Sequence, residues 1–156
     1  MLKKLALSLA MGAALAMPAA ASAQQLYSAH DLLEVLEAAQ SIGTGSLTRD
    51  STGDPKIDGK TEEINYSIMF YGCQNGRACT DIQFVASWDP GSVTIEKLNN
   101  WHREHRFGKA YLTETSAVIT LNANLDFGVS KENLRDHFNW WRKVAKEYRE
   151  DVILAK

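Results

Sequence analysis

Apolar residues occupy every second position on both sides of two cysteines, Cys73 and Cys79, and this feature constrains the fold most. Such alternation is typical of a strand with one buried face. The alternating residues are Ile64, Tyr66, Ile68 and Phe70 before the cysteines, and Ile82, Phe84 and Ala86 after them. Asn75-Gly76 lies between the cysteines, and Asn-Gly is a strong hairpin-turn signal. The sequence therefore predicts two antiparallel strands joined by a short loop that carries both cysteines.

This hairpin predicts a disulfide between the two cysteines. If Asn75-Gly76-Arg77 forms a three-residue loop, Gln74 faces Ala78 and Cys73 faces Cys79, at a separation that a disulfide can bridge. A bond that closes so short a loop stabilises the fold by roughly 2 kcal/mol. The alternative is a redox-active pair, but catalytic dithiols usually form Cys-x-x-Cys at a helix N-terminus. We therefore expect a structural disulfide.

Three further segments have helical periodicity, each after a residue that can cap a helix. Ser28 precedes a helix over 29–42, Thr94 precedes one over about 95–106, and Ser130 begins the last. The last helix carries a continuous apolar stripe, which consists of Leu134, Phe138, Trp141, Ala145, Tyr148 and Val152.

The remaining segments complete the predicted sheet. Residues 44–61 are rich in Gly, Ser, Thr and Asp and predict short strands joined by turns, and two more strands are expected at 111–112 and 117–125. The expected order is α-β-β-β-β-α-β-β-α. This order predicts an α+β fold in which helices pack on an antiparallel sheet.

The first 23 residues have the form of a secretory signal peptide. Lys3 and Lys4 precede the apolar run Leu5–Met17, Pro18 ends the run, and Ala21-Ser22-Ala23 supplies a cleavage site before Gln24. A membrane anchor is the alternative, but a span needs about 20 apolar residues. We therefore expect a periplasmic or secreted protein, with residues 24–156 as a single domain and no membrane span in the mature chain. An oxidising compartment also favours the disulfide.

Composition and motifs exclude several classes of function. The chain has 156 residues, a formal net charge of -2 and two cysteines, so it shows neither the basic surface of a nucleic-acid-binding protein nor a four-thiolate zinc site. The sequence contains no GxSxG, no HExxH, no Walker loop and no Rossmann glycine fingerprint. We therefore expect no enzyme activity, no cofactor, no metal and no nucleic-acid partner.

The end of the second predicted helix carries the most suggestive polar cluster, with His102 and His105 close to Trp101 and Arg106. The two histidines share a helix face, but two ligands do not make a metal site, so we expect one at the edge of the core and one in solvent. Trp140 lies about 100° from the apolar stripe of the last helix. It either packs under a loop or contributes to a binding surface.

The order and spacing of several motifs resemble the YbjN-domain family, whose proposed role is bacterial sensory transduction regulation. The resemblance covers about residues 26–155. The motifs are FYGCQNGRACTDIQFVASW at 70–88, Leu98-Asn99-x-Trp101, RFGKAYL at 106–112, Gly128-Val129-Ser130 and a final helix that bears tryptophan. The family pattern usually has Asn at the position of His102, and two glycines where this chain has Phe127-Gly128.

The resemblance implies a fold like that of type III secretion chaperones and a domain that pairs with itself or binds a partner segment. It implies no catalytic residue. The candidate binding residues are Asn99, Trp101, His102, His105, Arg106 and Trp140. We expect an exported, non-enzymatic binding or regulatory module with a protein partner or a homodimer. The alternative is a small periplasmic enzyme or ligand carrier that uses the helix face of Trp101, His102, His105 and Arg106.

Overall fold

The alternating segments form the centre of a six-stranded antiparallel sheet with strand order β1-β2-β3-β4-β6-β5. The computed structural model describes residues 24–155, so the predicted signal peptide lies outside the described residues. The strands are β1 (Thr44–Arg49), β2 (Pro55–Thr61), β3 (Ile64–Tyr71), β4 (Asp81–Trp88), β5 (Lys109–Leu112) and β6 (Ala117–Asn124). The helices are α1 (Leu32–Ser41), α2 (Ile95–Glu104) and α3 (Lys131–Tyr148), and α3 continues into the π-helical segment η1 (Arg149–Leu154). This order confirms the α+β prediction.

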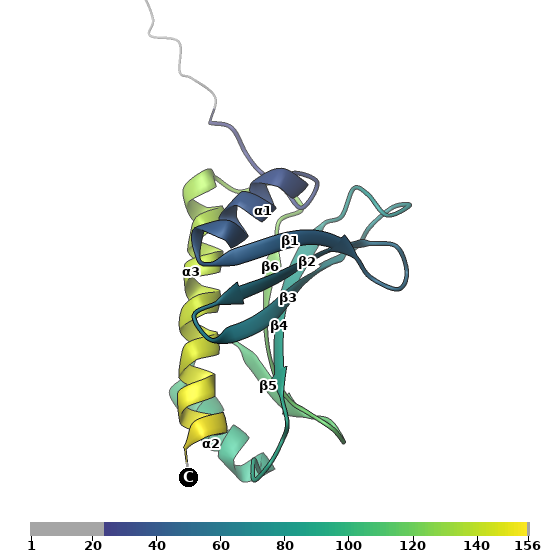
Figure 1. Ribbon diagram of the computed structural model, residues 1–156. Coiled ribbons are helices and arrows are strands. Elements are labelled where there is room, and N and C mark those ends of the chain that lie inside the picture. The colour runs from purple at the N-terminus through teal and green to yellow at the C-terminus, as the bar shows by residue number, and fades with distance from the viewer. Residues whose placement is uncertain (1–23, 156) are drawn as a thin grey trace, which may run out of the picture.

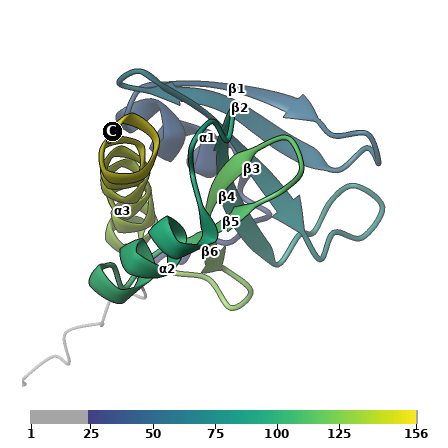
Figure 2. The ribbon, with the colours of Figure 1, turned by 90° about the horizontal axis from the view of Figure 1, so that it is seen from below.

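The apolar stripe of α3 forms the core against the sheet. All six residues predicted for the stripe are buried. Phe84 of β4 packs between two of them, because its ring stacks on Trp141 at 5.4 Å and meets Phe138 edge-on at 4.9 Å. Figures 1 and 2 show α1 and α3 on the same face of the sheet, with α2 close to the C-terminal end of α3. Burial of each large side chain contributes about 1.5–3 kcal/mol.

Two helix N-termini form as the sequence predicts, and one does not. Thr94 Oγ1 accepts a hydrogen bond from the amide of Lys97, and Ser130 Oγ accepts one from the amide of Asn133. The first helix begins at Leu32, not at residue 29. The Asp31 carboxylate accepts hydrogen bonds from both the amide and the hydroxyl of Ser28, at 2.7 and 3.1 Å, so Ser28 belongs to a turn before the helix.

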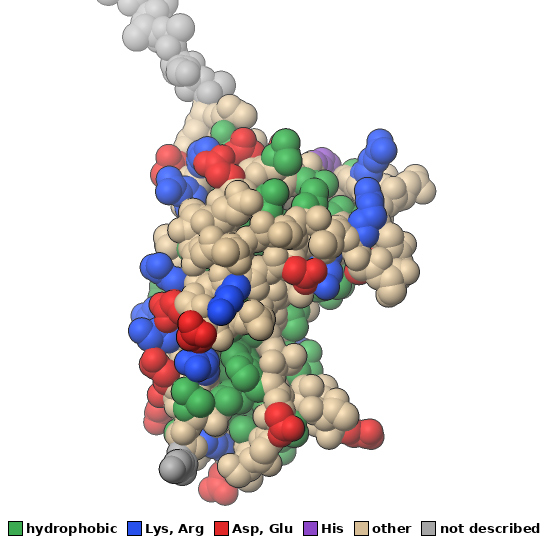
Figure 3. Space-filling model, viewed as in Figure 1, with side chains coloured by type: hydrophobic (Ala, Val, Ile, Leu, Met, Phe, Trp, Pro, Cys, Tyr) green, Lys and Arg blue, Asp and Glu red, His purple; other side chains and the backbone are tan. Residues whose placement is uncertain are grey.

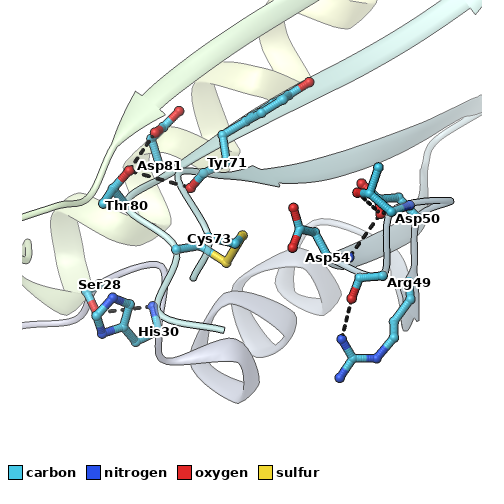
Figure 4. The surroundings of a disulfide bond; sticks show 12 residues. Ser28, His30, Arg49, Asp50, Asp54, Tyr71, Cys73, Thr80 and Asp81 are labelled. Atoms are coloured by element: carbon cyan, nitrogen blue, oxygen red, sulfur yellow. Dashed lines mark hydrogen bonds between the residues drawn. A yellow bond between two sulfur atoms is a disulfide. The ribbon is translucent and has the colours of Figure 1, made fainter. Parts of the chain in front are cut away.

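The hairpin between β3 and β4 contains the predicted disulfide between Cys73 and Cys79. Its loop differs from the prediction, because Gln74 pairs with Arg77 and not with Ala78. Asn75 and Gly76 both have positive φ, 54° and 67°, as a two-residue turn requires. Figure 4 shows the bond at the end of the sheet, beyond the hydrogen bonds of Thr80 to Tyr71 and Asp81.

None of the helices within residues 24–155 is both long enough and apolar enough to cross a membrane.

Candidate functional site

A cleft forms where the chain leaves α2 and crosses the C-terminal half of α3. We call it the α2–α3 cleft, and its volume is about 300 Å³. It is lined by Glu104, His105, Arg106 and Phe107 from the end of α2 and the following loop, and by Trp140, Lys143, Val144 and Glu147 from α3. Three of the predicted binding residues, His105, Arg106 and Trp140, are therefore brought together.

Gly108 allows the loop to lie this close to α3. Its φ is +89°, and a Cβ atom at this position would lie 2.7 Å from Val144 Cγ1 and 3.0 Å from Ile119 Cδ1. Only glycine combines a positive φ with so close an approach. The sequence predicts a helix over 95–106, but α2 ends at Glu104 and the chain bends toward Gly108. The bend places Phe107 over α3.

Trp101 lies buried beneath His105 and does not itself line the cleft. It is 4% exposed, and its ring meets the Tyr148 ring edge-on at 5.4 Å. The His105 ring stacks on the Trp101 ring, with a centroid distance of 4.5 Å and an interplanar angle of 9°. Burial raises the pKa of Tyr148 to about 12, so its phenol stays neutral at physiological pH.

His105 connects the end of α2 to the acidic side chains of α3 and η1. Its Nδ1 lies 2.9 Å from the Trp101 carbonyl oxygen. Its Nε2 lies 3.5 Å from a carboxylate oxygen of Asp151 and 4.0 Å from one of Glu147. The side chain is 19% exposed, so it matches the expected histidine at the core edge. The imidazole therefore joins the wall of the cleft to the acidic side chains of α3 and η1.

Phe107 and Trp140 form an aromatic pair at the surface. Their ring centroids lie 4.3 Å apart, and Phe107 is 37% exposed. Two cations flank the pair: the Arg106 guanidinium lies 5.3 Å from the Phe107 ring, and Lys143 Nζ lies 4.9 Å from the Trp140 ring. Trp140 therefore packs against a loop residue, as one of the two alternatives predicts, and it also lines the α2–α3 cleft. Charged side chains of both signs follow α3 in Figure 3.

Two other predicted binding residues point elsewhere. Asn99 is exposed on α2 and does not line the cleft. His102 Nε2 lies 3.1 Å from the carbonyl oxygen and 3.3 Å from the amide nitrogen of Ala110 in β5. The His102 ring therefore covers the outer edge of β5. The two histidines have separate partners, and residues 24–155 contain no group of three or more side chains arranged to hold a metal.

Sequence reasoning missed Phe107, Lys143 and Glu147 as members of the site. The sequence did contain a signal for Phe107, because it lies directly before Gly108 at the end of a predicted helix, in the motif RFGKAYL. Lys143 and Glu147 gave no signal, because a charged residue on a helix is usually only solvated.

Comparison with models of protein families places the chain in a family. The model of the YbjN family, described as "Putative bacterial sensory transduction regulator", matches residues 30–154. The matched region contains the whole sheet, the disulfide and every residue of the α2–α3 cleft. No curated protein matches the chain.

Proposed function

Because the chain belongs to the YbjN family, we propose that it is an exported, non-enzymatic binding module that holds a partner protein in the α2–α3 cleft. The observation that carries this proposal is the aromatic pair of Phe107 and Trp140 between two cations. The few residues that carry most of the binding energy in protein interfaces are enriched in tryptophan, tyrosine and arginine. The pair supports a partner with an apolar anchor residue.

The charged side chains around the cleft indicate which residues of the partner would lie next to its anchor residue. Arg106 and Lys143 flank the aromatic pair, and Lys143 lies 3.9 Å from Glu147 as an i,i+4 pair on α3. Such exposed pairs contribute little and separate easily, so Lys143 is available to a partner. An acidic residue next to the anchor residue of the partner could then form ion pairs with Arg106 and Lys143. Self-association through the same cleft is the second form of the proposal.

Export rests on the sequence of residues 1–23 and on the disulfide, which oxidising compartments favour. N-terminal sequencing of the protein from the periplasm or the medium should begin at Gln24. Recovery of an uncleaved chain from the cytosol, with reduced thiols, would overturn this part of the proposal.

The binding test compares two exposed phenylalanines. Phe107→Ser should abolish the partner recovered by affinity purification from the periplasm, or the dimer observed by analytical ultracentrifugation. Phe127→Ser is the control, because Phe127 is 90% exposed and lies outside the cleft. Equal loss in both variants, or in neither, would contradict the assignment of the cleft. Thermal unfolding of both variants separates lost binding from lost folding.

The alternative, a small enzyme or ligand carrier, is favoured by one observation. His105 stands at the cleft with the carboxylates of Glu147 and Asp151 behind it. A catalytic or ligand-binding role would make His105→Gln lose turnover or ligand affinity, whereas a partner site would depend more on Phe107. His102→Gln is the control, since its ring contacts β5 and not the cleft.

A further inference from the structure

A second concave site lies at the end of the molecule opposite α2. It is bounded by the start of α1, by the turn between β1 and β2 and by the disulfide hairpin (Figures 1 and 4). We call it the arginine pocket, and its volume is about 340 Å³. A groove of about 260 Å³ that reaches Leu47 shares three of its lining residues, which are Leu32, Arg49 and Pro55.

The floor of the arginine pocket is apolar. It consists of Ala29, Leu32, Pro55, Ala78 and Cys79. Two of these residues, Ala29 and Cys79, are almost completely buried. The disulfide fixes Cys79, and Ala78 has a positive φ of 51°, so the hairpin wall has a defined position. A pocket of this volume falls at the lower end of the range for small-molecule sites.

Close packing of two loops holds the pocket open. Arg49 Nη1 donates a hydrogen bond of 2.5 Å to the Gly53 carbonyl oxygen within the β1–β2 turn. A Cβ at Gly76 would lie 3.0 Å from the Gly53 oxygen and 3.3 Å from Arg49 Nη1. The tip of the hairpin therefore rests against the turn and against the Arg49 guanidinium.

Arginine and histidine side chains form the rim. Among the described residues, Arg49, Arg77 and His30 make no ion pair. Of the two neighbouring acids, Asp50 is held within the β1–β2 turn, because its Oδ1 accepts hydrogen bonds from Thr52 and from the amide of Asp54. The Asp54 carboxylate stands at the same turn (Figure 4), so the two arginines outnumber the one acid that faces them. Arg49 has donors beyond the one that binds Gly53, and a guanidinium binds a carboxylate through two parallel hydrogen bonds.

From the apolar floor and the unpaired cationic rim, we propose that the arginine pocket binds a small amphiphile with one carboxylate head and a short alkyl chain. The head meets Arg49 and Arg77, and the chain lies on Leu32 and Pro55 toward Leu47. This site is separate from the α2–α3 cleft and does not depend on the proposed function there.

The test is a titration of the purified, oxidised protein with octanoate, followed by amide NMR shifts. Octanoate should shift the amides of Leu32, Ala78 and Cys79, whereas octylamine and acetate at the same concentration should not. Equal binding of octanoate and octylamine would overturn the proposal, and so would shifts confined to the α2–α3 cleft. If a peptide with a free apolar C-terminus bound more tightly than octanoate, this would contradict the proposal that the ligand is a small amphiphile.

Variants test the rim directly. Arg49→Gln combined with Arg77→Gln should weaken octanoate binding at least about tenfold, the loss expected for charged hydrogen bonds. Arg77→Gln alone should weaken it severalfold, and it leaves the Arg49–Gly53 contact that supports the turn. Arg103→Gln on α2 is the matched control and should bind like the native protein. Native affinity in the double variant would overturn the proposal.

Discussion

At the scale of single residues, the core contains polar atoms that have no hydrogen-bond partner among residues 24–155. They are Tyr66 OH, Trp101 Nε1, Trp141 Nε1 and Tyr148 OH. A buried hydroxyl without a partner costs free energy, so its removal should not harm the fold. Tyr148→Phe should keep or raise the free energy of unfolding, by up to about 1 kcal/mol in urea denaturation. A loss of more than about 1 kcal/mol would mean that this hydroxyl has a partner in solution.

Asp58 on β2 makes the free energy of unfolding depend on pH in the acidic range. Partial burial opposes its ionisation, but hydrogen bonds from Lys56, Ser67 and Thr48 outweigh burial and hold the pKa of Asp58 below its ordinary value. The unfolded chain therefore binds a proton more readily than the folded protein. The contribution of Asp58 is complete above its unfolded pKa, about 4, and is lost as the pH falls through the lower folded pKa.

Asp58→Asn should therefore reduce the difference between the free energies of unfolding at about pH 6 and about pH 3. Urea denaturation at the two pH values measures it. Glu114→Gln, at an exposed position that forms no ion pair within residues 24–155, is the control and should leave the native difference unchanged. A difference in Asp58→Asn equal to that of the native protein would contradict a depressed pKa at this carboxyl.

At the scale of elements, the connection from α2 to β5 depends on Gly108. Gly108→Ala should lower the free energy of unfolding by about 1–3 kcal/mol, because it combines positive-φ strain with a contact on Val144. Gly91→Ala is the control, since Gly91 has a φ of +47° and nothing within 4 Å of its Cβ position. Chemical denaturation should show the larger loss at Gly108. Equal losses in the two variants would show that the positive φ alone destabilises the fold and that the contact with Val144 contributes nothing.

The β3–β4 hairpin provides the second test at this scale. Replacement of Cys73 and Cys79 together by serine should lower the free energy of unfolding by roughly 2 kcal/mol, because the disulfide closes a short loop. Thermal unfolding of the native and variant proteins measures the loss. A thiol assay on the unreduced native protein should find no free thiol, and two free thiols would contradict the bond.

Local signals in the sequence were enough to predict most elements. The alternation around the cysteines predicted β3 and β4, and the side chains of Thr94 and Ser130 predicted two helix starts. Tertiary contacts decided the exceptions. The hairpin loop shortened because both Asn75 and Gly76 adopt positive φ, and the bend at Gly108 ended α2 early. The contact of His102 with Ala110 depends on the packing of α2 beside β5, which no local pattern encodes.

At the scale of the whole molecule, one sheet and its helices share a continuous core within residues 24–155. The candidate site was predicted in part. The sequence analysis selected residues from two separate segments, which are Trp101, His105, Arg106 and Trp140. These segments meet only in the folded protein, so the contact of Phe107 with Trp140 could not be predicted from the sequence.

We propose that the protein is exported and binds a partner through the α2–α3 cleft, and both parts can be tested in one experiment. The most direct measurement places a photo-crosslinking amino acid at Phe107 or, as a control, at Phe127, and recovers the protein from living cells. We predict a discrete crosslinked species at Phe107, to a partner or to a second copy, on a chain that begins at Gln24. No crosslink at Phe107, or the same products at Phe127, would contradict the claim.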